Sequence, residues 1–205
     1  NLGVILDQFL TMNSQVSETC RKCFYHLRNI STIRKFLSQE AIAQLIHSLV
    51  TSRLDYCNAA LVGVTDANLK KLQRIQNVAA RILTCTPRDH HITPVLFRLH
   101  WLPVEARILF KILMFTFKAY HKIAPSYINE LVHHYNPERS LRSSAYNLLE
   151  VPRVRLKTYG DRAFSVAGPT EWNKLPASLR SLPTLSAFKS SLKTYLFRLY
   201  FADYC

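Results

Sequence analysis

Apolar side chains recur every three to four residues along most of this chain, which is the spacing of amphipathic α-helices. The spacing predicts longer helices over about residues 14–30, 38–54, 65–84 and 104–121, a short helix near 126–133 and a final helix after Pro183. Ser38, Thr65 and Thr184 stand at the starts of three of these segments, and their side chains are typical helix N-caps. The pattern therefore predicts a mainly α fold.

Short β-leaning runs interrupt this pattern. Residues 2–6 form an apolar run that is more typical of a strand than of a helix. Residues 148–151 and 163–166 also favour extended structure. They allow a small β-hairpin, with residues 159–161 near its turn and Gly168-Pro169 closing it.

Proline and glycine mark the boundaries between segments. Pro87, Pro94 and Pro103 indicate an ordered linker between the third and fourth long helices. The chain contains only 4 Gly, so folds with many strands and many tight turns are disfavoured. We detect no internal repeat and no low-complexity segment.

The composition allows a buried core and indicates a polyanionic partner. Hydrophobic residues make up 48% of the 205 residues, which is enough for a sizeable core. Lys and Arg number 27 against 13 Asp and Glu, so the formal net charge is +14. Self-repulsion of this size favours a partner of opposite charge such as nucleic acid; a basic surface that is merely solvated is the alternative.

The cysteine content and the hydropathy indicate in which compartment the protein is found and whether it enters a membrane. The chain has 5 Cys, an odd number, and nothing in it resembles a secretory leader. We therefore expect free thiols and an intracellular location, in the cytoplasm and nucleus. No apolar run approaches the ~18 residues that span a membrane, so we expect no membrane partner. The first residue is Asn rather than Met, and we expect a piece of a longer protein.

The third predicted helix carries a basic ridge opposite its apolar face. At about 100° per residue, the apolar positions fall on one side of the helix. These positions are Leu72, Ile75, Ala79, Ile82 and Leu83. The opposite side presents Lys70, Arg74, Asn77 and Arg81 in a fan of about 60°. We expect the three cations of this ridge to face solvent or phosphate.

The helix after Pro103 carries a second cationic stripe. Arg107, Lys111, Lys118 and Lys122 fall within about 60° of one another, and most other residues of the helix are large and apolar. Simple solvation explains an exposed stripe equally well. A solvated stripe is normally of mixed sign, however, and Glu105 is the only acid here. Contact with phosphates is therefore the competing interpretation.

Catalytic signatures are missing from the sequence. Metal-dependent nucleotidyl transfer needs carboxylates that lie close together, and no two acidic residues are neighbours in this chain. Cys20, Cys23 and His26 have spacing that suggests zinc, but on a continuous helix His26 would point away from the two cysteines. We therefore expect structural cysteines, no metal, no cofactor and no catalytic residue.

Long strings of residues give the chain a specific resemblance. These strings are Ser52-Arg53-Leu54-Asp55-Tyr56-Cys57-Asn58, Leu72-Gln73-Arg74-Ile75-Gln76-Asn77-Val78-Ala79-Ala80-Arg81, Leu99-His100-Trp101-Leu102-Pro103-Val104, Trp172-Asn173-Lys174-Leu175-Pro176 and the segment 188–197. In this order they resemble the carboxyl-terminal part of the reverse transcriptases of non-LTR retrotransposons (LINEs). The resemblance covers essentially the whole chain.

The resemblance implies a division of the chain and a role. Residues 1–12 would end a palm, 13–86 would form a three-helix thumb-like bundle, 87–103 the linker and 104–205 a helical C-terminal region. The catalytic palm would lie upstream in the same polyprotein. This fragment would then not be an enzyme by itself. It would bind the backbone of RNA or of an RNA–DNA hybrid during target-primed reverse transcription.

Two other interpretations stay open. The chain could be a retrotransposon remnant that a host uses as a standalone binding or interaction module, or an enzyme of another class. The reading frame upstream of Asn1 would distinguish a polymerase fragment from a host module. A frame that continues into a palm supports the polymerase, whereas a start codon with its own promoter supports the host module.

Overall fold

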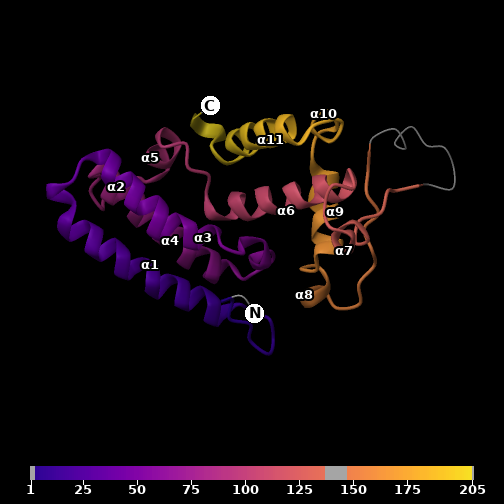
Figure 1. Cartoon of the computed structure of the whole chain (residues 1–205), viewed down its shortest axis with the longest axis horizontal. Coiled ribbons are helices and arrows are strands. Elements are labelled where there is room, and N and C mark those ends of the chain that lie inside the picture. Colours follow the sequence, from indigo (N-terminus) through magenta and orange to yellow (C-terminus); the bar gives the residue numbers. More distant parts are fainter. Residues whose placement is uncertain (1–2, 137–146, 205) are drawn as a thin grey trace. The chain divides into compact units, whose positions relative to one another are not determined.

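The computed structural model describes residues 3–136 and 147–204, and helices make up most of this part of the chain. Within it there is no strand or sheet, so the mainly α fold that the sequence predicts is confirmed. No described helix has both the length and the apolar character needed to cross a membrane. Figure 1 shows the order of the helices along the chain.

The chain forms two compact units. Unit 1 consists of Asn1–Ile108 together with Phe197–Cys205, and unit 2 consists of Leu109–Leu196. Helices α6 (Val104–Tyr120) and α11 (Leu185–Tyr200) each contribute residues to both units. The division into thumb, linker and C-terminal region is a statement about kinship, and it stays a prediction.

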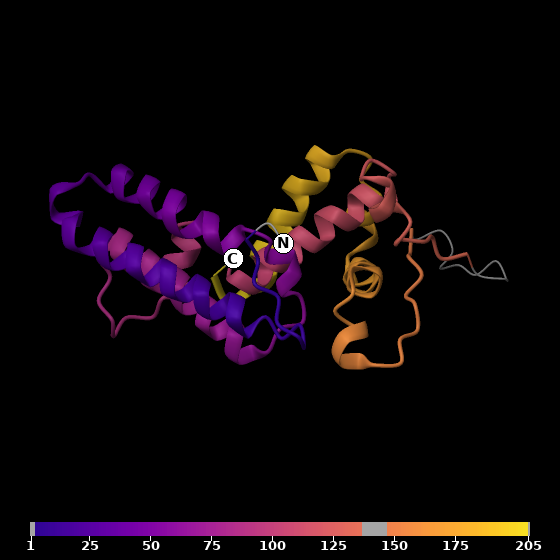
Figure 2. The same cartoon turned by 60° about the horizontal axis from the view of Figure 1, so that its bottom comes forward.

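Unit 1 is built on three helical segments around one apolar core. They are α1 (Asn13–Ile33), a segment in which α2 (Gln39–Ile46) continues through a π-helical turn (His47–Thr51) into α3 (Ser52–Asp55), and α4 (Asp66–Thr84). α1 packs along α4 (Figures 1 and 2). The core between them includes Val16, Leu27, Ile46, Leu72 and Ile75, all almost fully buried.

Local hydrogen bonds fix where these helices begin. The Ser38 hydroxyl accepts from the Ala41 N–H at 3.2 Å, and the Thr65 hydroxyl accepts from the Asn68 N–H at 3.4 Å. The third predicted N-cap, Thr184, accepts from the Ala187 N–H at 3.3 Å at the start of α11, so all three predicted N-caps are confirmed. α1 uses another device, because the Asp7 carboxylate accepts from the backbone N–H of Thr11 and Met12 just before the helix. These bonds, the one from Thr11 foremost, lower the pKa of Asp7.

A short helix occupies the stretch that proline punctuates. α5 (Thr93–Arg98) has Pro94 in its first turn, where a missing N–H costs no hydrogen bond. The Phe97 ring stacks on Phe197 at a centroid distance of 5.2 Å and also meets Phe201 and Tyr204. The predicted linker is therefore ordered and packs against the last residues of the chain.

Unit 2 has its own aromatic core. Besides parts of α6 and α11 it contains α7 (Ser126–Asn129), α8 (Lys157–Gly160), α9 (Phe164–Lys174) and α10 (Ala177–Arg180). The Phe117 ring stacks on Phe188 at 4.4 Å, and the Tyr120 ring stacks on Trp172 at 5.3 Å. The Asn173 side chain accepts from the N–H of Leu149 and donates to its carbonyl, at 2.9 and 2.8 Å. The Trp172-Asn173 pair thus ties an extended segment to this core.

The expected β-hairpin is wrong. Residues 163–166 lead into and begin α9, and Gly168-Pro169 lies inside that helix rather than closing a hairpin. Leu149 instead forms an isolated antiparallel bridge with His134. A Cβ at position 168 would lie 2.7 Å from the Thr116 hydroxyl oxygen, so a larger residue there would force the Thr116 side chain or the helices α9 and α6 to move. Tertiary packing of this kind overrides the local β-propensity. The strand-like run 2–6 is likewise not a strand over its described residues.

Candidate nucleic-acid interface

The helix α4 sorts its side chains as its periodicity predicts. Leu72, Ile75 and Ala79 are buried against the core of unit 1, whereas Lys70 and Arg74 on the opposite side are exposed. Arg81 is half-buried. The guanidinium carbon of Arg74 lies 5.9 Å from the centroid of the Phe24 ring on α1, a cation–π contact that aligns the side chain across α1.

A groove along α1 and α4 gathers five arginines. Its volume is about 1010 Å³, and its cationic lining consists of Arg28, Arg34, Arg74, Arg81 and Arg88. None of the described residues that line it is Asp or Glu, while Ser31 and Thr32 add hydroxyl groups. We call it the arginine groove. Guanidinium groups keep their charge at every physiological pH and match phosphate geometry in a bidentate way.

Two of these arginines are anchored by backbone carbonyls. Arg81 donates to the carbonyl oxygens of Pro87 and His90, the second at 2.7 Å, and so holds the loop that carries Arg88. Arg34 donates to the Ile82 carbonyl at 3.4 Å. A guanidinium has five N–H donors, so one or two anchoring bonds leave other donors for a phosphate. The groove therefore has a positioned set of charges.

One carboxylate lies on the loop beside the groove without lining it. The side chain of Asp89 is 82% exposed, and one carboxylate oxygen lies 3.3 Å from Nδ1 of His90. The pKa of Asp89 is lowered, first by a hydrogen bond from its own backbone N–H and then by His90 and the nearby charge of Arg81. Asp89 is thus ionised at neutral pH but points into solvent.

The structure adds three arginines that the helical pattern alone did not reveal. Arg28 and Arg34 come from α1 and the 3-10 turn after it, and Arg88 comes from the loop after α4. One sequence signal could have indicated the first two. Between Glu18 and Glu40 there is no acidic residue but five Lys and Arg. The position of Arg88 depends on the carbonyl contacts of Arg81, which no local pattern predicts.

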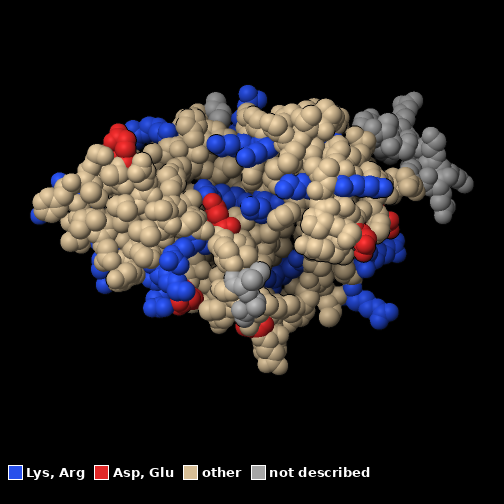
Figure 3. Space-filling model, viewed as in Figure 1, with Lys and Arg blue, Asp and Glu red and all other residues tan. Residues whose placement is uncertain are grey.

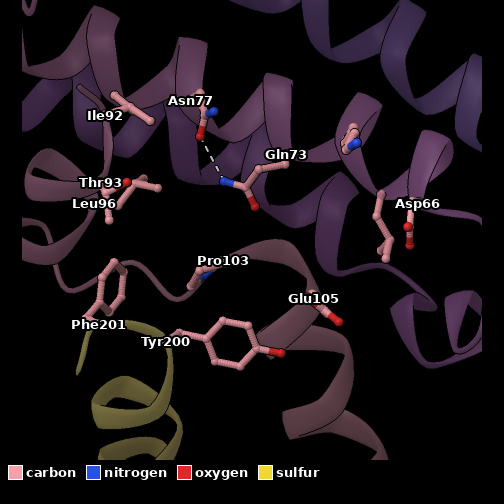
Figure 4. Close-up of a pocket in the computed structure, with 12 residues that line it drawn as sticks. Asp66, Gln73, Asn77, Ile92, Thr93, Leu96, Pro103, Glu105, Tyr200 and Phe201 are labelled. Atoms are coloured by element: carbon pink, nitrogen blue, oxygen red, sulfur yellow. Dashed lines mark hydrogen bonds between the residues drawn. The ribbon is translucent and has the colours of Figure 1, made fainter. Parts of the chain in front are cut away.

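Lys70 lies in a different hollow from Arg74 and Arg81. It lines a pocket of about 490 Å³ in unit 1, shown in Figure 4. Asp66 and Glu105 line the same pocket. The predicted ridge of α4 is therefore divided. Of its three cations, Arg74 and Arg81 line the arginine groove and Lys70 does not, while Asn77 lines both hollows.

Amide side chains of α4 have a structural use in this second pocket. Gln76 donates to the Leu102 carbonyl at 2.8 Å, and the Gln73 amide oxygen accepts from the Val104 N–H at 2.9 Å. Gln73 also donates to the side-chain oxygen of Asn77, the bond drawn in Figure 4. Gln73 thereby satisfies an unpaired N–H at the start of α6. Two of the strings that carry the resemblance meet here.

Arg107 of the second predicted stripe is engaged within unit 1. Its guanidinium makes a two-pronged ion pair with the Asp55 carboxylate, in which Nε lies 2.8 Å from one oxygen and Nη2 contacts the other. Only 21% of the Arg107 side chain is exposed. This arginine bridges α6 and α3, so its charge is already compensated by a carboxylate of the same unit.

The three lysines of the stripe belong to unit 2. Lys111 is exposed, Lys118 is half-buried, and Lys122 is exposed beyond the last turn of α6 with a positive φ of 55°. Within the described ranges, no carboxylate forms an ion pair with any of them. They form no part of the arginine groove, and their contact with phosphates stays a prediction.

Lys and Arg make up most of the charged groups on one face of the molecule (Figure 3). On the face shown in Figure 3, the groups of Lys and Arg outnumber those of Asp and Glu. Several of the remaining cations are paired, because Glu18 binds Arg21 and Lys22 and Glu171 binds Lys174. The arginine groove differs from these surface pairs because its charges converge without a carboxylate among them.

The cysteines of α1 have structural surroundings. Cys23 is fully buried, and its Sγ lies 3.9 Å from the Val50 carbonyl. Burial raises the pKa of this thiol to about 11 and also raises that of the half-buried Cys20. Both are therefore protonated thiols at neutral pH. Among the described residues, no three His, Cys, Asp or Glu side chains cluster in a way that could hold a metal ion.

Comparison of the chain with protein-family models, with curated proteins and with solved structures finds no match.

Proposed function

We propose that this chain is a nucleic-acid-binding part of a non-LTR retrotransposon reverse transcriptase. In this proposal the arginine groove of unit 1 holds the sugar–phosphate backbone of a template–primer hybrid or of element RNA. An upstream palm of the same polyprotein would perform the chemistry, in the nucleus or the cytoplasm. The chain itself would contribute binding and no catalytic step.

One observation carries the proposal. Five arginines from α1, α4 and the adjoining segments line one groove with no described carboxylate in its lining. Bringing like charges together is unfavourable unless an anion compensates them. A phosphodiester chain supplies regularly spaced anions, and arginines bind its phosphates without regard to base sequence. The kinship to reverse transcriptases, which rests on the sequence strings, specifies RNA and RNA–DNA hybrids as the nucleic acids.

Salt dependence tests the proposal directly. The affinity of the full chain for a fluorescein-labelled RNA–DNA hybrid is measured by anisotropy at several salt concentrations. If ~5 phosphates are engaged, log K falls against log salt with a slope of about −4. A response that is flat in salt would remove the electrostatic basis of the proposal.

A matched pair of variants locates the contact. Arg74→Gln removes one charge from the groove, and Arg98→Gln removes one from the exposed end of α5, outside the groove. The first variant should reduce the slope by about 0.9, the value for one phosphate, while the second should leave it unchanged. Equal effects of both variants would show that net charge, and not the groove, determines binding. Circular dichroism melts verify that both variants fold.

A further inference from the structure

An exposed phenylalanine follows Arg34, a lining residue of the arginine groove, by two positions in the chain. Phe36 is 78% exposed, more than any other large hydrophobic side chain of the described residues. It closes the 3-10 turn Arg34–Phe36 that follows α1, and Arg34 of the same turn lines the groove. Proteins that bind single-stranded nucleic acid combine a positively charged groove with aromatic side chains on which the bases stack.

The backbone around this ring is fixed. The Leu37 N–H donates to the Arg34 carbonyl at 3.1 Å, and α2 starts directly afterwards with its Ser38 cap. Leu37 itself packs against the core of unit 1. Phe36 is therefore presented by an ordered turn between two helices.

The charged residues that precede Phe36 in the chain, from Arg21 to Lys35, are all positive. The Lys35 ammonium lies 4.8 Å from the centroid of the Phe36 ring. From Thr19 to Gln39 the sequence has five Lys and Arg and no carboxylate, so the turn places an aromatic ring in a segment whose charged residues are all basic. This combination suits a partner that has both negative charge and flat apolar faces, and single-stranded nucleic acid has both.

We propose that Phe36 stacks on an unpaired base of the nucleic acid whose backbone lies in the arginine groove. This inference rests on the proposed function and adds a preference to it. Inside a continuous duplex the base faces are already stacked on one another, so the ring finds a free face only at a junction between duplex and single strand or at an overhang. The chain therefore prefers such junctions to a blunt hybrid of equal length.

The concave groove favours this partner over an anionic bilayer. Basic and aromatic residues together also bind lipid surfaces. The five arginines, however, line a groove, and a planar bilayer cannot follow a groove. A nucleic-acid strand can pass along it while its terminal base reaches the turn.

A double-mutant cycle tests the stacking contact by removing the Phe36 ring and the overhang base one at a time and together. The full chain and its Phe36→Leu variant are titrated with a hybrid that bears a single-stranded overhang and with the same hybrid made abasic at the overhang nucleotides. We expect Phe36→Leu to weaken binding of the intact overhang about 10-fold. The same substitution should have no effect on the abasic hybrid or on a blunt one. Phe36→Trp should retain the preference for the overhang.

A control and the opposing outcomes complete the design. Tyr25→Leu removes another exposed aromatic ring, which lies within α1 and away from the turn Arg34–Phe36, and it should not alter binding. Losses that are equal for intact and abasic overhangs would overturn the stacking contact. Retention on vesicles of anionic phospholipid that Phe36→Leu abolishes, without any change in overhang binding, would also overturn it in favour of a lipid surface.

The result separates this inference from the proposed function. If hybrid binding depends on salt and on Arg74 but not on Phe36, only the stacking contact fails. If no salt-dependent binding exists for any nucleic acid, the groove and the stacking contact fail together. Because Phe36 is uncharged, its substitution should leave the slope of log K against log salt unchanged.

Discussion

The cations of α4 and those of α6 look alike in the sequence but have different surroundings in the structure. Arg74 of α4 faces α1 across a groove that holds four further arginines. On α6, Arg107 is paired with Asp55, and the exposed Lys111 lies outside that groove. Helical periodicity predicts which side of a helix is exposed to solvent. The neighbouring elements determine whether an exposed cation is paired with a carboxylate, stands alone or forms part of a binding site.

The strongest way to break this comparison is to remove two cations from each set. Arg28→Gln/Arg74→Gln should lower the affinity for an RNA–DNA hybrid about 50-fold at ~0.1 M salt, because two phosphate contacts are lost. Lys111→Gln/Lys122→Gln removes the same charge from unit 2 and should change the affinity less than about threefold. Anisotropy titrations compare the two variants. Similar losses would contradict the special role of the groove.

A second variant tests the structural role of Arg107. Arg107→Gln leaves the Asp55 carboxylate without its ion pair and should lower the free energy of unfolding by about 1–2 kcal/mol. Its affinity for the hybrid should stay within about twofold of the original value. Urea unfolding measures the first quantity and anisotropy the second. A variant that is fully stable but binds weakly would place Arg107 in the interface instead.

Gln73 sharpens the contrast between polar side chains that bind partners and those that hold the fold. Gln73→Leu removes the acceptor for the Val104 N–H at the start of α6. We expect a loss of about 1 kcal/mol in the free energy of unfolding. Urea unfolding of Gln73→Leu, with the exposed Gln39→Leu of α2 as the control, measures this loss. An unchanged midpoint would show that water replaces the amide without cost.

The smallest expected effect is on thermal stability and concerns the ion pairs of Glu18 on α1, which lie outside the arginine groove. Hydrogen bonds from Arg21 and then Lys22 lower the pKa of Glu18 from 4.5 to about 2. The ionised Glu18 carboxylate therefore stabilises the folded chain fully above pH 4.5, and this contribution is lost as the pH falls toward 2 and the carboxylate is protonated. Glu18→Gln should melt slightly lower than the original chain at pH 6, and the difference should vanish near pH 2. A difference in melting temperature that grows on acidification would contradict this assignment.

The sequence predicted the features that depend on local periodicity and capping. Ser38 and Thr65 cap the helices that they precede, and the buried face of α4 carries the expected residues. It could not predict the ion pair between Asp55 and Arg107, because 52 residues separate the two partners. The hairpin failed for a related reason, since Val166, Ala167 and Trp172 are buried on α9 by contacts that the local residues do not reveal.

The arginines of the candidate site likewise fall into those that the helical pattern predicts and those that depend on tertiary structure. Arg74 and Arg81 follow from the helical wheel of α4, because they lie opposite its apolar face. Arg28 joins them only because α1 packs beside α4, and Arg88 joins them only because Arg81 binds the carbonyls of the following loop. A groove that two elements and a loop build together is a property of tertiary structure, so no single segment could reveal it.

Crosslinking tests the central claim most directly. The full chain is bound to an RNA–DNA hybrid with photoreactive nucleotides in its RNA strand, irradiated and digested, and the crosslinked peptides are identified by mass spectrometry. The account predicts crosslinks in peptides from residues 28–38 and 74–88, the two sides of the arginine groove. Crosslinks confined to residues 109–133 of unit 2, with none in those two peptides, would contradict it.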